Sequence, residues 1–276
     1  MKTILTICVL SISSILSAQN GVQWESEIDV SDGATYGNIR PRMALTANDI
    51  PVILYGKAGS GFLYVSRWNG TSFDNPVSIL PTGMETYLAG WTGPDIAAKG
   101  DTVVVVFKAL PVEDGNVYSV RSTDGGITFS DTIRVDDHDQ GTAWMPSLDI
   151  SDAGNPVITY MAHDGAWANP SYNVVTSNDQ GLTYNPEMEV TNPVPGEVCD
   201  CCPAEVVIDG SKQVMIFRNN EANLRDVYGV LSLDDGATFP FQNNIDNLGW
   251  VVNSCPSTGP HGLFVGDDFY QVSSNK

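Results

Sequence analysis

The sequence predicts an all-β chain that folds as a β-propeller of four-stranded antiparallel blades. A turn pattern of eight residues recurs at a constant spacing of 55 residues, which is typical of one structural unit repeated along a chain. Each repeat also contains a proline followed by a short strand and then by a strongly apolar strand. The 26 glycines and 16 prolines, with almost no helical periodicity, indicate short strands joined by tight turns.

The repeated turn has the pattern Ser-x-Asp-x-Gly-x-Thr-aromatic, and a degenerate fourth copy runs from Ser66 to Phe73 with Trp68 at the Asp position. Ser and Asp side chains accept hydrogen bonds from turn amides, and glycine supplies a positive φ, so the pattern predicts a β-hairpin. The three full copies contain Ser122, Asp124, Gly126, Thr128 and Phe129; Ser177, Asp179, Gly181, Thr183 and Tyr184; and Ser232, Asp234, Gly236, Thr238 and Phe239.

The other strands of each repeat are predicted from prolines and apolar runs. Each first strand follows one of the prolines Pro41, Pro94, Pro146, Pro203 and Pro260. These first strands are expected at residues 42–45, 95–98, 147–150, 204–208 and 261–264. More apolar second strands are expected at residues 52–55, 103–107, 157–160 and 214–217. A third strand then runs into the repeated turn and a fourth leaves it, so each repeat forms one blade.

The repeated turn resembles the Asp-box, or bacterial neuraminidase repeat, of sialidases and related propellers. This resemblance implies a six-bladed ring in which the boxes are structural. Residues 22–30 resemble the strand at 182–190 that follows a box, so we expect them to be a lone fourth strand that closes the ring. The fifth repeat stops within its second strand at Lys276, so we expect a propeller that is incomplete at its C-terminus. Residues 19–276 are expected to form this single domain.

The N-terminus and the overall charge predict an exported protein. Residues 1–18 combine Lys2, a short apolar run and a small-residue end at Ala18, the features of a secretory signal peptide. We therefore expect a secreted or periplasmic bacterial protein with no membrane span, and a monomer. The 33 acidic residues outnumber 13 basic ones and give a net charge of -20. Such a surface repels phosphate backbones, which excludes nucleic acid as a partner.

Strand direction predicts which end of the propeller carries the ligand. The loops before the first strands and those between second and third strands share one end, whereas the repeated turns occupy the other. Ligand sites are concave, and the mouth of a propeller's central channel is the natural place for one. The side chains that we predict to bind the ligand at this end are Arg40, Arg42, Trp91, Trp144, His163, Trp167, Arg218, Arg225 and Asp226.

The arginines have two interpretations. Propellers of the sialidase superfamily bind a sugar carboxylate with an arginine cluster, whose first member lies beside a proline before the first strand. Arg40-Pro41-Arg42 resembles that position, and bidentate pairing with a carboxylate is the physical reason for an arginine there. The alternative is that Arg225 and Asp226 form a structural ion pair and that Arg40 is a solvated strand end.

Catalytic residues are harder to place. Sialidases carry an acidic Asp between the second and third strands of the first blade, but the corresponding residues 56–61 contain no carboxylate. Glu221 and Asp164 are the remaining candidates for an acid and a base. Two functions follow: a sialidase-type glycoside hydrolase that requires no cofactor, or a non-catalytic propeller that binds a glycan, a protein or a metal.

Four cysteines precede the first strands of consecutive repeats: Cys199, Cys201, Cys202 and Cys255. An even number in an exported chain predicts disulfides, with Cys201 or Cys202 bonded to Cys255 and a vicinal bridge as the alternative. The other interpretation is a thiolate site for copper(I) or zinc, with His261 as a further ligand. The Cys-x-Cys-Cys-Pro and Cys-Pro-x-x-Gly-Pro motifs also resemble those of a group of bacterial sialidase-like propellers.

Overall fold

The computed structural model describes residues 26–139, 141–192 and 194–275. The helices in these ranges are single turns: α1 (Gly33–Tyr36), η1 (Ala47–Asp49) and η2 (Gly165–Trp167). None of them is long and apolar enough to cross a membrane. The predicted signal peptide lies outside the described residues and stays a prediction.

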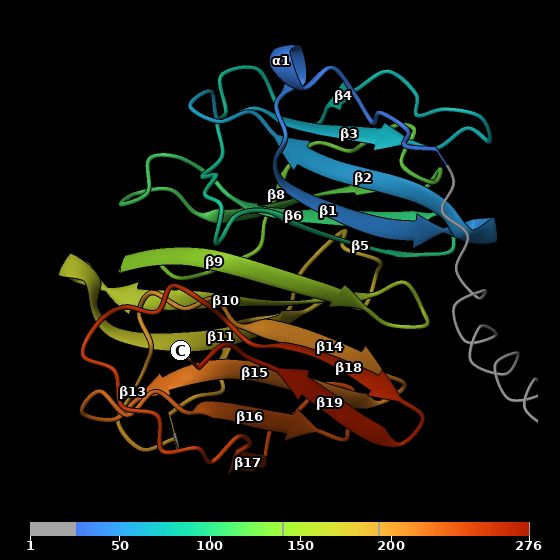
Figure 1. The fold of residues 1–276 in the computed structure, drawn as a ribbon. Helices are drawn as coiled ribbons and strands as arrows, with labels where there is room; N and C mark the ends of the chain where they lie inside the picture. Colours follow the sequence, from blue (N-terminus) through green and yellow to red (C-terminus); the bar gives the residue numbers. More distant parts are fainter. Residues whose placement is uncertain (1–25, 140, 193, 276) are drawn as a thin grey trace, which may run out of the picture.

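The strands of the described residues form five antiparallel sheets (Figure 1). The first two sheets contain β1 (Ile39–Thr46), β2 (Ile50–Gly56), β3 (Leu63–Arg67) and β4 (Val77–Ser78); and β5 (Asp95–Lys99), β6 (Thr102–Lys108), β7 (Val117–Ser122) and β8 (Ile133–Arg134). The third contains β9 (Gly141–Ile150), β10 (Pro156–Asp164), β11 (Ala168–Thr176) and β12 (Met188–Glu189). The fourth contains β14 (Glu205–Asp209), β15 (Lys212–Asn220), β16 (Val227–Ser232) and β17 (Phe241–Asn244), with β13 (Glu197–Val198) paired to the far end of β15. The fifth is the hairpin β18 (His261–Val265) and β19 (Asp268–Val272).

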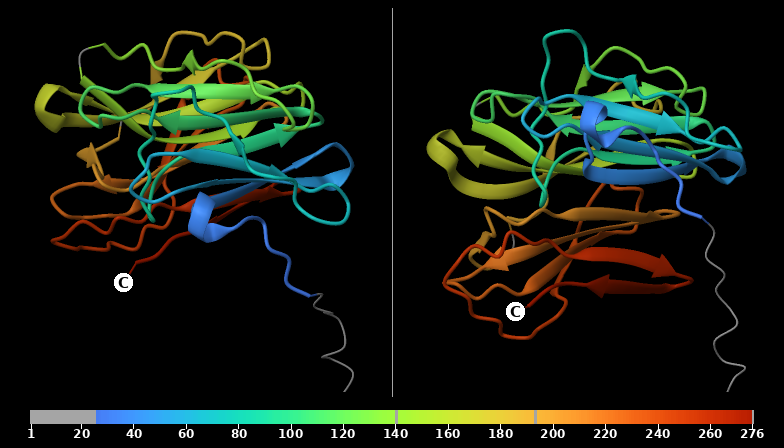
Figure 2. Two further views of the ribbon diagram at one scale, coloured as in Figure 1. Left: turned by 90° about the horizontal axis from the view of Figure 1, so that it is seen from above. Right: turned by 45° about the horizontal axis from the view of Figure 1, so that its top comes forward.

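The sheets follow one another in chain order as the blades of a propeller (Figure 2). Their first strands β1, β5, β9, β14 and β18 are successive neighbours. Residues of all five strands line one cavity of about 970 Å³, which we call the central channel. The predicted propeller of four-stranded antiparallel blades is therefore confirmed, whereas the number of six blades stays a prediction.

Two first strands begin earlier than predicted. β1 and β9 do not start after Pro41 and Pro146 but run through them, and the pairing register shifts at both places. The residues before these prolines, Arg40 and Met145, have φ values of 51° and 50°, in the left-handed region. Each proline thus marks a β-bulge inside a longer strand rather than the start of one, because the irregular pairing needs no amide donor from it.

The predicted closing strand is not formed by the part of it that the structure describes. Residues 26–30 have no strand pairing, and residues 22–25 lie outside the described ranges. A closing fourth strand would pair with the third strand of the last blade. The hairpin β18–β19 has only two strands, so it presents no third strand as a partner.

The repeated turns form the predicted hairpins. In the second copy, the Ser177 hydroxyl accepts a hydrogen bond from the Gly181 amide at 2.9 Å. The Asp179 carboxylate accepts bonds from the Thr183 hydroxyl at 2.6 Å and from the Thr183 amide at 2.9 Å. These bonds lower the pKa of Asp179 to about 2, because they favour the ionised carboxylate. The same network recurs at Ser122–Asp124–Gly126–Thr128 and at Ser232–Asp234–Gly236–Thr238.

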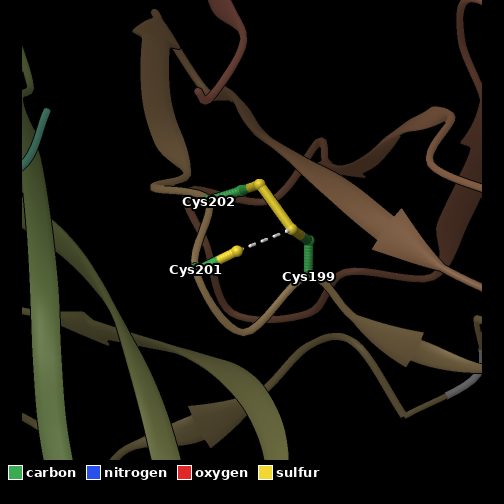
Figure 3. Close-up of side chains that lie close together, drawn as sticks. All are labelled: Cys199, Cys201 and Cys202. Atoms are coloured by element: carbon green, nitrogen blue, oxygen red, sulfur yellow. Dashed lines mark hydrogen bonds between the residues drawn. A yellow bond between two sulfur atoms is a disulfide. The ribbon is translucent and has the colours of Figure 1, made fainter. Parts of the chain in front are cut away.

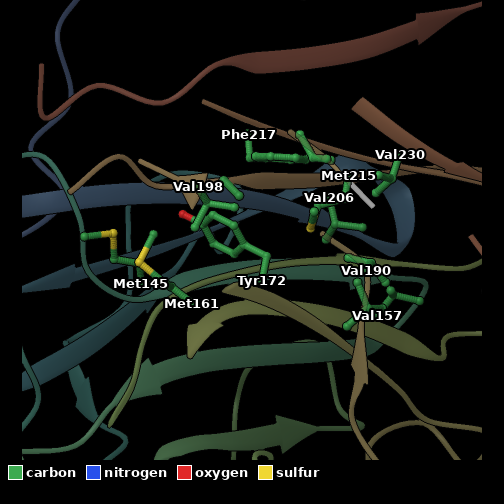
Figure 4. Close-up of a cluster of buried hydrophobic side chains, with 13 residues drawn as sticks. Met145, Val157, Met161, Tyr172, Val190, Val198, Val206, Met215, Phe217 and Val230 are labelled. Carbon is green, nitrogen blue, oxygen red and sulfur yellow. The ribbon is translucent and has the colours of Figure 1, made fainter. Parts of the chain in front are cut away.

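Apolar side chains fill the space between successive blades in three clusters. β6 is buried along its whole length between the first and third blades. The cluster between the third and fourth blades contains Tyr172 and Phe217, whose ring centroids lie 6.0 Å apart (Figure 4). The second and third blades bury both faces against neighbours, so their inner strands β6 and β10 are continuous apolar runs, whereas β1 and β18 alternate because one face of each is exposed.

One disulfide lies within the loop before β14, and a second joins that loop to the one before β18. Cys199 is bonded to Cys202, and Cys201 is bonded to Cys255. Cys201 and Cys202 both face the Cys199 sulfur (Figure 3), with the Cys199 and Cys201 sulfurs 3.7 Å apart. The expectation of disulfides that include a bond to Cys255 is confirmed, and the vicinal alternative is not the one formed.

Removing the Cys201–Cys255 disulfide by the double change Cys201→Ser and Cys255→Ser should destabilise the fold. The bridge spans a sequence separation of 54 residues. Closing a loop of that length lowers the entropy of the unfolded chain and so raises the free energy of unfolding by about 4 kcal/mol. Urea unfolding of the oxidised protein measures the loss. The Cys199–Cys202 bridge stays intact in this variant, so a change in the urea midpoint reports the loss of the Cys201–Cys255 bridge alone. An unchanged midpoint would contradict the expectation.

Removal of one hydroxyl from a repeated turn should also lower stability. Ser177→Ala leaves the buried Gly181 amide without an acceptor, so we expect the free energy of unfolding to fall by about 1–3 kcal/mol. Ser78→Ala, at an exposed position of β4, is the matched control and should leave the urea midpoint unchanged. Equal effects of the two changes would show that the turn bonds are not stabilising.

Candidate functional site

Arg40 lies at the mouth of the central channel. The bulge before Pro41 turns it out of the β1 ladder, and it lines the channel together with Trp91. Burial, and then the nearby Arg42, lower the pKa of Arg40 to about 10, so the guanidinium is charged at neutral pH. Within the described residues, Arg40 makes no hydrogen bond or ion pair, and its Nε is buried. The half-buried guanidinium feels the charge of Asp95 but makes no direct bond with it, so its donors remain available to an anionic ligand.

Aromatic side chains form a wall beside Arg40. Trp144 of β9 stands at its centre, and its ring centroid lies 5.8 Å from that of Trp91 and 5.2 Å from that of Trp167. Tyr87 packs against the same ring at 6.2 Å. Trp167 is 39% exposed, so one edge of the wall faces solvent. The structure therefore brings together three of the predicted aromatic residues, and Tyr87 is a member that the sequence did not reveal.

His163, at the end of β10, belongs to this wall. Its ring lies 5.2 Å from Trp167 and 6.2 Å from Trp144, and the residue is only 2% exposed. Burial lowers the pKa of His163, so the imidazole is neutral at neutral pH. Neither ring nitrogen has a hydrogen-bond partner among the described residues. The residue lines neither the channel nor the second pocket, which Asp164 lines, so its role is to pack inside the wall behind the tryptophans.

The other predicted arginines are held by the protein itself. Arg42 faces Asp95, with Nε and Oδ1 3.6 Å apart. Arg218 is completely buried; its guanidinium lies 4.8 Å from the Trp250 ring. It donates to the carbonyl oxygens of Thr258, Arg225 and Ser274 and to the side chain of Asn275. Both arginines therefore link different blades of the propeller to each other.

The predicted pair of Arg225 and Asp226 is not an ion pair. The Arg225 guanidinium donates to the sulfur of Cys199 at 3.2 Å instead. The Asp226 carboxylate accepts bonds from the Asn244 side chain and from the Gly249 and Trp250 amides. Two adjacent residues of an extended segment point to opposite faces, which explains why the neighbours in sequence take different partners.

The two carboxylates expected to act as acid and base lie apart from the channel. Asp164 is exposed, accepts a bond from Asn169 at 2.6 Å and lines a separate pocket of about 580 Å³. Glu221 is exposed in a turn that is closed by mutual backbone bonds with Leu224. Neither residue lines the channel beside Arg40. The geometry therefore does not support them as a catalytic pair.

Three carboxylates that the sequence analysis missed line the channel instead. Asp95 accepts a bond from the Leu148 amide of the next blade at 3.2 Å, and Asp149 accepts one from the Ile208 amide at 2.7 Å. Glu205 likewise accepts from the Gly262 amide. We call Asp95, Asp149 and Glu205 the carboxylate ring. Each member joins the first strand of its own blade to that of the following blade.

Burial sets the protonation of this ring. It raises the pKa of Asp95, and it raises that of Asp149 to about 6, because a low-dielectric channel disfavours the charged form. Glu205 is paired with His261 at 3.0 Å, and this bond raises the pKa of the imidazole. His261 was expected as a metal ligand beside the cysteines; in the structure its partner is Glu205, and the cysteines bond to one another.

Comparisons with known proteins agree with the fold. No family model matches the sequence, and no curated protein matches it. Solved structures do match: an α-L-arabinanase of Penicillium chrysogenum has a TM-score of 0.58 at 15% identity, over 86% of this chain and 75% of its own. The α-L-arabinofuranosidase Arb93A of Fusarium graminearum has a TM-score of 0.50 at 13% identity, over 75% and 66%. A Hadza microbial sialidase, Hz136, matches at 0.47 and 13% identity, over 76% and 59%.

At these identities the likeness concerns the fold alone. The β-propeller fold that the repeated turn implied is confirmed by the arabinanase and the arabinofuranosidase, and the chain spans about two thirds of the latter. The protein thus has the β-propeller architecture that carbohydrate-active enzymes also use.

The raised pKa of Asp149 predicts a dependence of stability on pH. Between about pH 4 and pH 6, folded Asp149 holds a proton that the unfolded chain has released, so stability falls as the pH rises through this window. Asp149→Asn should flatten this part of the profile in urea unfolding. Asp131→Asn, at an exposed position, is the control and should reproduce the slope of the parent protein. A variant slope equal to that of the parent protein would contradict the assignment.

Proposed function

We propose that the protein is an exported, glycan-recognising propeller that binds an acidic sugar at the mouth of the central channel. The unpaired Arg40 guanidinium is the observation that carries this proposal. A planar guanidinium matches a carboxylate with two parallel hydrogen bonds, and partial burial strengthens that pairing. The signal peptide expected at residues 1–18 supports export.

The aromatic wall supports a sugar as the bearer of that carboxylate. Trp91 lines the channel with Arg40, and Trp144 and Trp167 continue the wall outwards. Flat aromatic faces suit the apolar faces of sugar rings. A ligand of this kind would contact an arginine at one end and tryptophan rings along its length.

The net charge of -20 repels anions, so the proposal requires that the repulsion be weak inside the channel. The carboxylate ring lies in the same channel, but its members do not repel an anion fully. Asp149 takes up a proton as the pH falls through its pKa of about 6, and His261 offsets the charge of Glu205 when it is protonated. The negative charge of the channel around Arg40 therefore falls as the solution becomes mildly acidic.

Hydrolysis of the bound glycan is the second candidate, and Asp149 is the observation that favours it. A general acid must hold a proton near the working pH, and a carboxyl with a pKa of about 6 meets that requirement. Asp149 lines the same channel as Arg40. An enzyme of this kind would use Asp149 in place of the expected Glu221 and Asp164.

Binding of a sialylated trisaccharide, compared with the same sugar lacking its sialic acid, tests the first proposal. We expect the parent protein to prefer the sialylated ligand in calorimetric titration. Arg40→Ala should weaken that binding about 10- to 100-fold, the value of a charged hydrogen-bonded pair, and leave the neutral sugar unaffected. Arg121→Ala, near the repeated turns, is the matched control. Equal affinity for the two sugars would refute the proposal.

Turnover of a fluorogenic sialoside tests the second candidate separately. We expect Asp149→Asn to abolish turnover while it leaves sialoside binding intact, because the amide cannot donate the required proton. Binding without any turnover in the parent protein would eliminate hydrolysis of this substrate and leave recognition standing. Turnover that survives in Asp149→Asn would remove Asp149 from the mechanism.

A further inference from the structure

The sulfurs of Cys199, Cys201 and Cys202 form one compact cluster across the two bridges. The sulfurs of Cys199, Cys201 and Cys202 all lie within 4.8 Å of one another, and Cys255 is bonded to Cys201. A tetrahedral ion with metal–sulfur bonds of about 2.3 Å places its sulfurs about 3.8 Å apart. The Cys199 and Cys201 sulfurs already stand at 3.7 Å. The Cys199–Cys202 pair would need to separate to that distance, and Cys255, held next to Cys201 by its bridge, would need to turn toward the other sulfurs.

The Cys199–Cys202 bridge contributes little stability, because a backbone hydrogen bond already closes the same turn. Cys199–Cys202 spans a sequence separation of three residues, and the Cys202 amide already donates to the Cys199 carbonyl at 3.1 Å across the same turn. Closing so short a loop restricts the unfolded chain far less than the separation of 54 residues between Cys201 and Cys255. Two buried cysteines at this turn therefore call for a further explanation.

Arg225 supplies an independent observation. It is only 7% exposed, it forms no ion pair among the described residues, and its Nε is buried without a partner. Its guanidinium donates to the sulfur of Cys199 at 3.2 Å. A buried cation requires an anion, and a disulfide sulfur is neutral. A metal-bound thiolate at Cys199 would supply the negative charge that this guanidinium lacks in the structure.

We propose that the reduced cysteines Cys199, Cys201, Cys202 and Cys255 form a binding site for one soft d10 cation, Zn²⁺ or Cu⁺. The site is distinct from the proposed glycan site. Four thiolates around Zn²⁺ carry a net charge of about -2, and the Arg225 guanidinium offsets part of it. His261 takes no part, because it is held by Glu205.

Reduction proceeds from the exposed side of the cluster. An external dithiol supplies two electrons and two protons to each disulfide and is itself oxidised to a disulfide. Cys255 is exposed, so the Cys201–Cys255 bridge is opened first. The freed Cys201 thiolate lies beside Cys199 and exchanges with the buried bridge: a Cys201–Cys199 bond forms, and Cys202 leaves as a thiolate and takes up a proton. A second dithiol then reduces the new bond, and Zn²⁺ displaces the remaining thiol protons.

Metal binding by the anaerobically reduced full chain tests the proposal. A phosphine serves as reductant because it leaves no competing thiol, and Zn²⁺ and Cu⁺ are added in separate arms. We expect roughly one equivalent of bound metal per chain after gel filtration in at least one arm, and its release on reoxidation. Co²⁺ should give the visible spectrum of a tetrahedral four-thiolate site.

Variants locate the site. Cys202→Ser and Cys255→Ser should each abolish stoichiometric binding, while His261→Ala, the matched control, should leave it unchanged. Arg225→Gln should weaken binding about 10-fold, as expected for a group that supports the ligands, and Arg225→Lys should restore part of it. The near-ultraviolet circular dichroism spectrum reports the fold of each reduced variant.

Three results would overturn the proposal. The first is a reduced protein that keeps its circular dichroism spectrum but binds neither metal. The second is a reduced protein that unfolds and is refolded by neither metal. The third is binding that persists when all four cysteines are replaced by serine.

Discussion

The hydrogen bond from a carboxylate of one blade to a backbone amide of the next is the interaction on which the propeller depends. Asp95, Asp149 and Glu205 make it in turn, and each reaches the first strand of the following sheet. First strands of different blades do not share a β-ladder. Amides that face a channel therefore need side-chain acceptors, and these carboxylates satisfy them where water would otherwise compete.

The sequence predicted the repeated turns and the four-stranded blades because their determinants are local. The hydrogen bonds of Asp179 all lie within its own turn, so the eight residues of the pattern are sufficient to predict the turn. The carboxylate ring escaped prediction for the opposite reason. Its members stand at different offsets from the preceding proline, and the amides they bind lie in another repeat. A pattern search within one repeat does not reveal a partner in the next.

The candidate site was predicted in part. Strand direction alone predicted that Arg40 and the tryptophans share one end, and in the structure they lie close together. Which arginine is free could not be predicted, since this depends on contacts distant in sequence. Arg218 donates hydrogen bonds to the carbonyl oxygens of Thr258 and Ser274, and Arg225 donates one to the sulfur of Cys199. Arg40 is left over because its bulge turns it away from such partners.

The carboxylate ring also has a direction. Every bond runs from an acid in an earlier blade to an amide in a later one. As the chain leaves the ribosome, a newly formed blade exposes one carboxylate that water still solvates, and the next blade arrives with the amide that covers it. The structure therefore suits growth from the N-terminus across the second, third and fourth blades, each of which presents one solvated acid to the blade that follows it.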